Sequence, residues 1–110
     1  MNVIFLQGVR NYFDSLIPIL YEKEYFGFKE TAKRYVDDLF DDIETSLPTR
    51  LHRTAPKYFD KYGKNMEYAV FKKSKRTEWY VFFRMYKKNG EEIYQVRYIG
   101  NNHTIAQYLC

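Results

Sequence analysis

The sequence predicts an α+β domain in which an antiparallel β-sheet is covered on one face by two helices. Apolar residues recur every three or four positions in the first half of the chain, which is the period of a helix. The second half shows the period of two that is typical of strands, and its strands follow one another. A short apolar stretch, 1–7, predicts one more strand at the start. The expected order is strand, helix, helix and three strands, in a single domain that spans residues 1–110.

Two helices are expected between the first strand and Pro48. Pro18 lies inside the first helical pattern and should kink or split it, because proline has no backbone N–H to donate. Gly27 is expected to end that segment. The stretch 28–47 is the clearest helix in the chain, and Pro48 should stop it, directly or after one more turn.

Charge is divided unevenly along the chain. Residues 1–47 carry five Lys/Arg and nine Asp/Glu, net −4, whereas residues 48–110 carry thirteen and five, net +8. The basic half is a candidate for contact with a polyanion, unless the two halves neutralise each other across the fold. The acids of the second helix are expected to form a solvated face rather than a metal site. They are Asp37, Asp38, Asp41, Asp42 and Glu44.

Three strands and a short helix are expected after Pro48. The strand stretches, rich in aromatic and β-branched residues, are 66–73, 77–86 and 92–100. A short helix is expected around 55–63, and residues 103–109 should form a last helical turn or a short strand. Asn89-Gly90 is the strongest short-range signal for a hairpin. A two-residue turn there fixes the pairing, so that the numbers of opposed residues sum to 179.

This register sorts the hairpin side chains between two faces. The first face, which is apolar and should meet the helices, holds Trp79, Val81, Phe83 and Met85 opposite Gly100, Tyr98, Val96 and Tyr94. The second face interleaves Arg84, Gln95 and Arg97 with Tyr80, Phe82 and Tyr86. Arginines among aromatic rings grip phosphates and stack bases, so Arg84 and Arg97 are predicted RNA contacts. A solvated sheet face also carries arginines without such a function, and a slip of one residue would exchange the two faces.

The same register brings two polar segments to one end of the sheet. Because Gly100 is expected opposite Trp79, residues 75–78 and 101–104 should be neighbours. The predicted cluster consists of Lys75, Arg76, Asn101, Asn102 and His103. It has the character of an anion site with a titratable group at its edge, and Asn102 is a predicted substrate contact.

The cluster holds the residue types needed to cleave RNA through its own 2′-hydroxyl. That reaction needs a base, cations near the phosphate oxygens and an acid for the leaving oxygen. His103 could supply the acid or the base near neutral pH, and Lys75 and Arg76 the positive charge. Tyr108 could orient the substrate or donate a proton. The structural alternative is that His103 caps the chain after the strand, as polar loop residues often do.

No cofactor or metal site is expected. The single cysteine, Cys110, cannot form an internal disulfide, and the sequence has no Cys/His spacing of a zinc site. Residues 1–20 lack the basic start of a signal peptide, and no apolar run approaches the roughly 18 residues of a membrane helix. We therefore expect a cytoplasmic protein that has no membrane partner.

Several of these stretches resemble the RelE/ParE superfamily, the toxins of type II toxin–antitoxin modules. They are the order of strands and helices, the block "KKSKRTEWYVFF" and the ending "YQVRYIGNNHTIAQYL". "WYVFF" followed by a strand that ends in "NNH" is similar to a subgroup described as plasmid-stabilisation proteins. The resemblance covers residues 25–109, and residues 1–24 more loosely.

The resemblance implies a β-α-α-β-β-β fold and one of two activities. RelE-like members cut mRNA in the ribosomal A site without a metal, whereas ParE-like members inhibit DNA gyrase. Both are neutralised by a cognate antitoxin, which wraps an extended or helical segment around the toxin.

The resemblance also implies site residues. Lys73, Lys75 and Arg76 match the basic block of the family, and His103 and Tyr108 match its C-terminal histidine and tyrosine positions. Residues 101–110 have none of the Arg/Lys that is usual in the family's tail. This departure leaves a ParE-like activity or an inactive homologue as alternatives.

Overall fold

The computed structural model describes residues 2–22, 29–73 and 75–109. Gly27, expected to end the first helix, and Cys110 lie outside the described residues. The strands are β1 Asn2–Phe5, β2 Arg53–Thr54, β3 Glu67–Lys72, β4 Glu78–Lys88 and β5 Glu91–Asn101. The α-helices are α1 Gln7–Glu22, α2 Lys29–Ser46 and α3 Asn102–Ile105, and the 3₁₀ helices are η1 Leu47–Thr49, η2 Lys57–Tyr62 and η3 Ala106–Tyr108.

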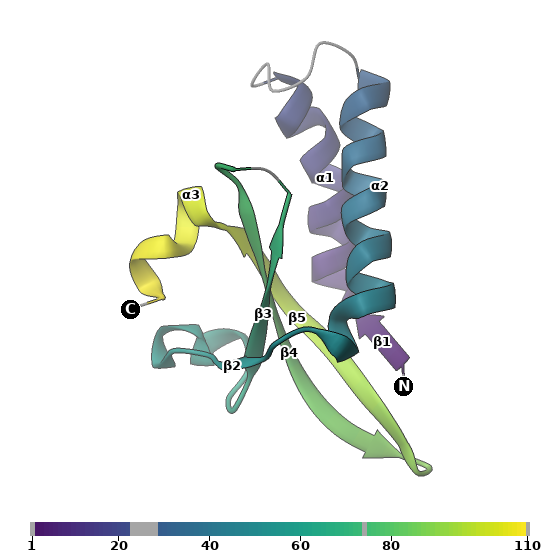
Figure 1. Ribbon diagram of the computed structural model, residues 1–110, viewed down its shortest axis with the longest axis vertical. Coiled ribbons are helices and arrows are strands. Elements are labelled where there is room, and N and C mark those ends of the chain that lie inside the picture. Colours follow the sequence, from purple (N-terminus) through teal and green to yellow (C-terminus); the bar gives the residue numbers. More distant parts are fainter. Residues whose placement is uncertain (1, 23–28, 74, 110) are drawn as a thin grey trace.

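The strands form one sheet in the order β1-β5-β4-β3-β2, with the α1–α2 hairpin on one face (Figure 1). Strands β2 to β5 pair antiparallel, whereas β1 pairs parallel with β5. The α+β class is therefore confirmed, but the sheet is mixed rather than antiparallel. The expected strand count missed β2, because two residues are too few to show a period.

The two long helices follow the sequence pattern closely. Helix α1 continues through Pro18 without being split. Pro18 lies on the exposed side of α1, where water can bind the carbonyl of Asp14 that the missing N–H leaves without a partner. Helix α2 ends at Ser46, and Pro48 then sits in a single 3₁₀ turn, as expected.

The acids of α2 form a largely exposed face. Asp37 pairs with Lys33 at 2.6 Å, and the half-buried Asp42 accepts from Arg50 at 3.1 Å. The guanidinium of Arg50 also lies 4.2 Å from the centroid of the Phe71 ring. This pair therefore ties the end of α2 to β3.

The β4–β5 hairpin corrects the expected register. Asn89 and Gly90 adopt φ values of 54° and 81°, and the pairs from Lys88–Glu91 to Phe83–Val96 follow the predicted sum of 179. A β-bulge then adds one residue, Arg97, to β5. Beyond it the register prediction is wrong, because a turn fixes pairing only until an extra residue intervenes.

The bulge exchanges the faces of the residues that follow it. Tyr98, expected on the helix side, pairs with Phe82 on the opposite face, and Ile99 takes its place under the helices. We call the core between the sheet and the two long helices the helix-side core. Its largest buried side chains include Phe71, Trp79 and Phe83.

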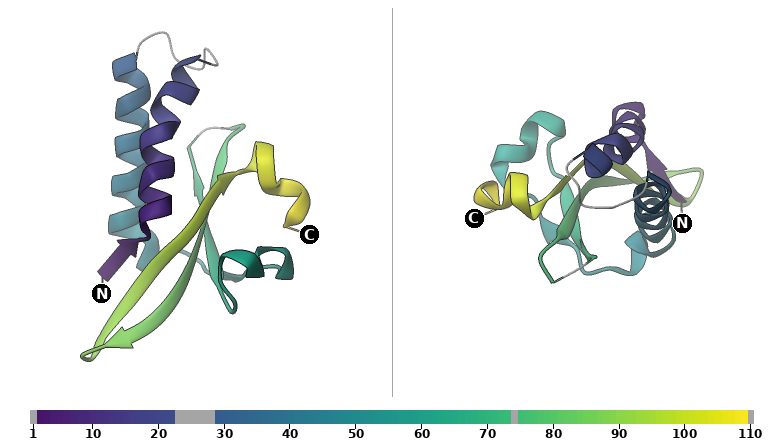
Figure 2. Two further views of the ribbon diagram at one scale, coloured as in Figure 1. Left: turned by 180° about the vertical axis from the view of Figure 1, so that it is seen from behind. Right: turned by 90° about the horizontal axis from the view of Figure 1, so that it is seen from above.

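The second face of the sheet is covered rather than bare. Helix η2 and the C-terminal α3–η3 segment lie side by side over it, on the side away from α1 and α2 (Figures 1 and 2). They enclose a small second core that consists of Phe59, Met66, Phe82 and Ile105. Phe59 stacks on Phe82 with ring centroids 4.2 Å apart. Most aromatic residues of the expected RNA face are therefore packing residues.

Candidate functional site

The C-terminal helical segment starts in the polar residues that follow the last predicted strand. Asn101 has extended backbone angles, φ −111° and ψ 166°, and its side chain accepts a hydrogen bond from the His103 N–H at 2.9 Å. This is an N-cap, the preferred position of asparagine at a helix start. The cap turns the chain so that residues 102 and 103 face the β3–β4 loop.

Asn102 and His103 contact that loop directly. The Asn102 Oδ1 accepts from the Glu78 N–H at 2.9 Å, and its Nδ2 donates to the Arg76 carbonyl at 3.0 Å. The His103 Nε2 lies 3.3 Å from the Thr77 hydroxyl. The expected neighbourhood is therefore present. We call Lys75, Arg76, Thr77, Asn102 and His103 the rim cluster.

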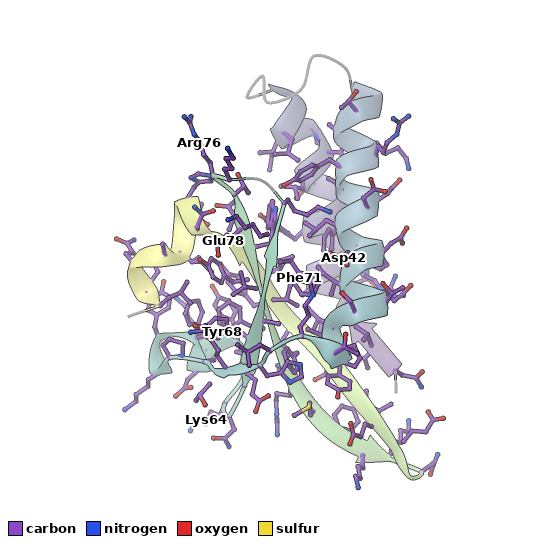
Figure 3. The ribbon with its side chains drawn as sticks, viewed as in Figure 1. Asp42, Lys64, Tyr68, Phe71, Arg76 and Glu78 are labelled. Carbon is purple, nitrogen blue, oxygen red and sulfur yellow. The ribbon has the colours of Figure 1, made fainter. Side chains whose placement is uncertain are left out.

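The members of the rim cluster differ in their exposure to solvent and in their hydrogen bonds. Lys75, Arg76 and His103 are exposed, and Arg76 lies at the far end of the β3–β4 pair in Figure 3. Asn102, a predicted substrate contact, uses both ends of its amide on backbone groups, which makes it a structural tie. Lys73 closes the loop, because its N–H donates to the Thr77 carbonyl at 3.1 Å.

Glu78 also borders the rim cluster. It is half-buried, lies just below Arg76 in Figure 3, and stands opposite Lys72 in the β3–β4 strand register. A carboxylate here reduces the positive potential beside the loop. Side chains along β4 alternate between the two faces of the sheet, so the sequence pattern itself places Glu78 on the second face with Tyr80.

Tyr108 lies away from the rim cluster, at the other end of the α3–η3 segment. Its ring stacks on Tyr58 of η2 with centroids 3.8 Å apart and planes 3° apart. The Lys61 Nζ lies 4.0 Å from the centroid of the Tyr58 ring. We call these three residues the tyrosine–lysine column. The i, i+3 spacing of Tyr58 and Lys61 on a 3₁₀ helix is the sequence signal for their proximity.

The column has its own electrostatics. A hydrogen bond from Lys61, and a weaker contribution from the Tyr108 hydroxyl, lower the pKa of Tyr58. The same hydrogen bond to Tyr58 raises the pKa of Lys61. Tyr58 thus carries a more acidic hydroxyl than an isolated tyrosine.

The two arginines of the expected RNA face are separated from the rim cluster. Arg84 is exposed and lies six residues beyond Glu78 along β4, roughly 20 Å at strand spacing. Arg97 is the bulged residue. Its Nε donates to the Tyr62 carbonyl at 2.6 Å and its Nη1 to Gln95 Oε1 at 2.7 Å. Neither arginine is in position to bind the same phosphate group as the rim cluster.

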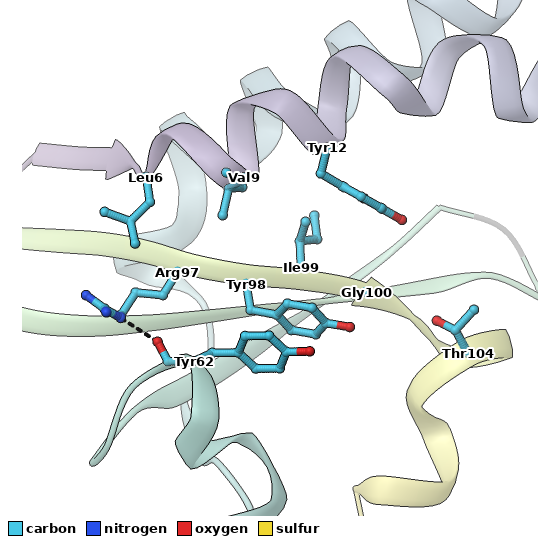
Figure 4. Close-up of a pocket in the computed structure, with 10 residues that line it drawn as sticks. Leu6, Val9, Tyr12, Tyr62, Arg97, Tyr98, Ile99, Gly100 and Thr104 are labelled. Atoms are coloured by element: carbon cyan, nitrogen blue, oxygen red, sulfur yellow. Dashed lines mark hydrogen bonds between the residues drawn. The ribbon is translucent and has the colours of Figure 1, made fainter.

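Arg97 instead lines a groove beside β5 (Figure 4). The cavity measures about 550 Å³. It runs between α1 and η2, and its largely apolar walls include Leu6, Val9, Tyr12, Tyr62, Tyr98 and Ile99. Burial, followed by the neighbouring Tyr62, raises the pKa of Tyr98 strongly. Strand β1 pairs with β5 only as far as Val96, so beyond it no described strand covers this edge of β5.

Comparison with known proteins identifies no relative. No family model matches the chain, and neither a curated protein nor a solved structure matches it significantly. Among residues 2–22, 29–73 and 75–109, no group of three His, Cys, Asp or Glu side chains is arranged to hold a metal ion. The described helices include none that is long and apolar enough to cross a membrane.

Proposed function

We propose that this protein is the toxin of a type II toxin–antitoxin module, of the RelE/ParE class, and that it cleaves mRNA on the ribosome. The observation that carries the proposal is the rim cluster, in which His103 lies against Thr77 beside the exposed Lys75 and Arg76. The order of elements along the chain, β1, α1, α2 and then β3, β4 and β5, agrees with the order that the resemblance implies, with β2 as an addition.

The proposed reaction uses the 2′-hydroxyl of the RNA as the nucleophile. Neutral His103 takes the proton of that hydroxyl, the 2′-oxygen bonds to phosphorus, and the bond from phosphorus to the 5′-oxygen breaks. Lys75 and Arg76 stabilise the negative oxygens of the transition state. The leaving 5′-oxygen takes a proton from water, because the cluster is exposed. Tyr108 takes no part in proton transfer in this scheme, since it belongs to the column.

We assign the groove beside β5 to the cognate antitoxin. An extended segment could pair with the uncovered edge of β5 through main-chain hydrogen bonds and place alternate apolar side chains against Leu6 and Val9. The guanidinium of Arg97, oriented by Tyr62 and Gln95, favours an acidic residue in that segment.

A ParE-like inhibitor of DNA gyrase is the second candidate. The middle of the second face carries Tyr68, Val70 and Tyr80, all half-buried, rather than cations. Tyrosine-rich surfaces are common in protein interfaces. Such a toxin would bind its target without chemistry at His103.

One induction experiment separates these functions. We expect induced wild-type protein to arrest growth and translation and to leave DNA supercoiling unchanged, and His103→Ala or Arg76→Ala to relieve the arrest. Loss of supercoiling with intact mRNA would favour the gyrase inhibitor. Normal growth in every strain would contradict both candidates and leave a non-toxic binding domain.

A further inference from the structure

The tyrosine–lysine column is a built cluster that the proposed cleavage reaction does not use. Tyr58 and Lys61 belong to η2, and Tyr108 belongs to η3. The column is anchored below, because the Tyr58 ring meets Phe59 edge-on at 5.0 Å and Phe59 is fully buried in the second core. Tyr58 therefore has a fixed position even though 42% of its surface is exposed.

The geometry limits what the column can bind. Tyr108 covers one face of the Tyr58 ring at 3.8 Å, and the Lys61 ammonium lies over the ring at 4.0 Å. The two cannot share a face at these distances, so both faces of Tyr58 are occupied. A nucleobase cannot stack there. What the column presents to solvent is the hydroxyl edge of Tyr58 and the ammonium of Lys61.

Those two groups are matched to an anionic oxygen. Lys61, and more weakly Tyr108, lower the pKa of Tyr58, so its O–H is a more acidic donor than that of an isolated tyrosine. The Lys61 ammonium has three N–H donors and is exposed to solvent. Hydrogen bonds from such donors to a charged oxygen are stronger than neutral ones.

We propose that Tyr58 and Lys61 form a phosphate-binding site for the backbone of single-stranded RNA, with Tyr108 as the positioning residue that holds Tyr58. The site lies on the same side of the sheet as the rim cluster (Figure 1). Phe59, the neighbour of Tyr58, stacks on Phe82. The row that pairs Phe82 with Tyr68 is four residues, roughly 13 Å at strand spacing, from the row that pairs Glu78 with Lys72 beside the rim cluster. The inference rests on the proposed action on RNA.

The test is direct binding of a fluorescein-labelled ten-nucleotide oligouridylate, followed by fluorescence anisotropy at several salt concentrations. Lys61→Met should weaken binding and reduce the slope of log K against log salt by about 0.7, the value for one phosphate contact on a single strand. Tyr58→Phe keeps the stacked ring and removes the donor, so it should weaken binding roughly three- to tenfold. Lys88→Met, at the distant hairpin tip, is the control that removes the same charge.

The outcomes separate this site from the proposed reaction. Weaker binding by Lys61→Met and Tyr58→Phe, with Lys88→Met unchanged, supports the site even if the protein cleaves no message. Wild-type affinity and slope in both η2 variants would overturn it, as would an equal loss in Lys88→Met or no binding by the wild type. Circular dichroism establishes that each variant is folded. Tyr108→Phe should retain the ring stack and raise the pKa of Tyr58. This pKa is measured by NMR on ¹³Cζ-labelled tyrosine, and the Tyr58 signal is assigned as the one that Tyr58→Phe removes.

Discussion

At the scale of single residues, Gly63 and Arg97 depend on each other. Gly63 adopts φ 153° and ψ 137°, a backbone conformation that side chains other than hydrogen rarely tolerate. A Cβ on Gly63 would lie 2.6 Å from the Arg97 Nε, which is the atom that donates to the neighbouring Tyr62 carbonyl. The glycine thus lets the bulged arginine pass over the end of η2.

We predict that Gly63→Ala lowers the free energy of unfolding by roughly 1–3 kcal/mol, from backbone strain and the displaced Arg97. Gly8→Ala is the matched control, because nothing lies within 4 Å of its Cβ position in α1. It should be neutral or stabilising by up to about 1 kcal/mol, as alanine is in a helix. Urea unfolding measures both. Equal stability of the two variants would contradict the role of Gly63.

The sequence predicted some residue-level contacts and missed others for identifiable reasons. The neighbourhood of Asn102, His103 and the β3–β4 loop followed from the hairpin, because an error of one residue in register still leaves the two segments at the same end. The contacts of Arg97 and the pairing of Tyr58 with Tyr108 could not be predicted. Both depend on η2, whose position over the sheet has no periodic signal in the sequence.

At the scale of elements, η2 and the α3–η3 segment act together as a lid on the second face. Phe82 and Tyr86 both belong to β4, and strand alternation places them on the same face. Phe82 is fully buried beneath Phe59, whereas Tyr86 is 41% exposed further along the hairpin. The lid therefore buries the part of the second face around Phe82 and leaves the part around Tyr86 exposed to solvent.

We predict that Phe82→Ala lowers the free energy of unfolding by roughly 3–5 kcal/mol, the usual cost of truncating a buried phenylalanine. Tyr86→Ala should cost less than about 1 kcal/mol, because its surroundings are largely solvent. Both variants are compared by urea unfolding. Similar losses at the two positions would mean that the second face is not covered as described.

A second element-level prediction concerns the attachment of α3. Asn102→Ala removes the partners of the Glu78 N–H and the Arg76 carbonyl together, so it should cost roughly 1–3 kcal/mol. Thr104→Ala is the control, since its hydroxyl donates to the nearby Asn101 carbonyl rather than to the β3–β4 loop. Hydrogen exchange should show faster exchange of the Glu78 amide in Asn102→Ala. Unchanged exchange at Glu78 would argue against the tie.

The element order was predictable because helix and strand periods differ and Asn-Gly turns are specific. The face assignment beyond Arg97 was not, because a bulge adds a residue without a glycine or proline to mark it. The helical segments of the lid were expected, around 55–63 and over 103–109. Their packing over the second face was not predictable, since short 3₁₀ helices have too few residues to show an amphipathic pattern.

At the scale of the whole molecule, tyrosine side chains that are partly or fully buried shape the alkaline stability. Burial is the largest cause of a raised pKa in a set that comprises Tyr12, Tyr35, Tyr80, Tyr94 and Tyr98. Above the ordinary tyrosine pKa of 10.0 the unfolded chain releases protons that the folded chain retains. The folded state then binds more protons, so stability falls as pH rises.

We therefore predict that the free energy of unfolding declines as pH rises above about 10, the ordinary tyrosine value. Tyr98 has the largest shift, and Tyr98→Phe should make the decline shallower. Urea unfolding at about pH 8, 9.5 and 10.5, on both sides of that pKa, measures the slope. Identical slopes in the variant and the wild type would exclude Tyr98 as the main cause.

The charge of the whole molecule fits the proposed function. The basic half of the sequence supplies the sheet, the β3–β4 loop and η2, whereas the acids gather on the exposed face of α2. Arg50 and Asp42 form an ion pair between the two halves. Lys75 and Arg76, at the edge of the second face, are exposed, which suits contact with a polyanion.

Cleavage of mRNA by the rim cluster is tested most directly with purified protein and ribosomes stalled on a defined message. Mapping the RNA ends by primer extension should show cuts in the A-site codon for the wild type and for Lys88→Met. His103→Ala should lower the rate roughly 10²- to 10⁴-fold, the usual contribution of an acid–base group. An intact message with the wild type, or equal cutting by His103→Ala, would contradict the account.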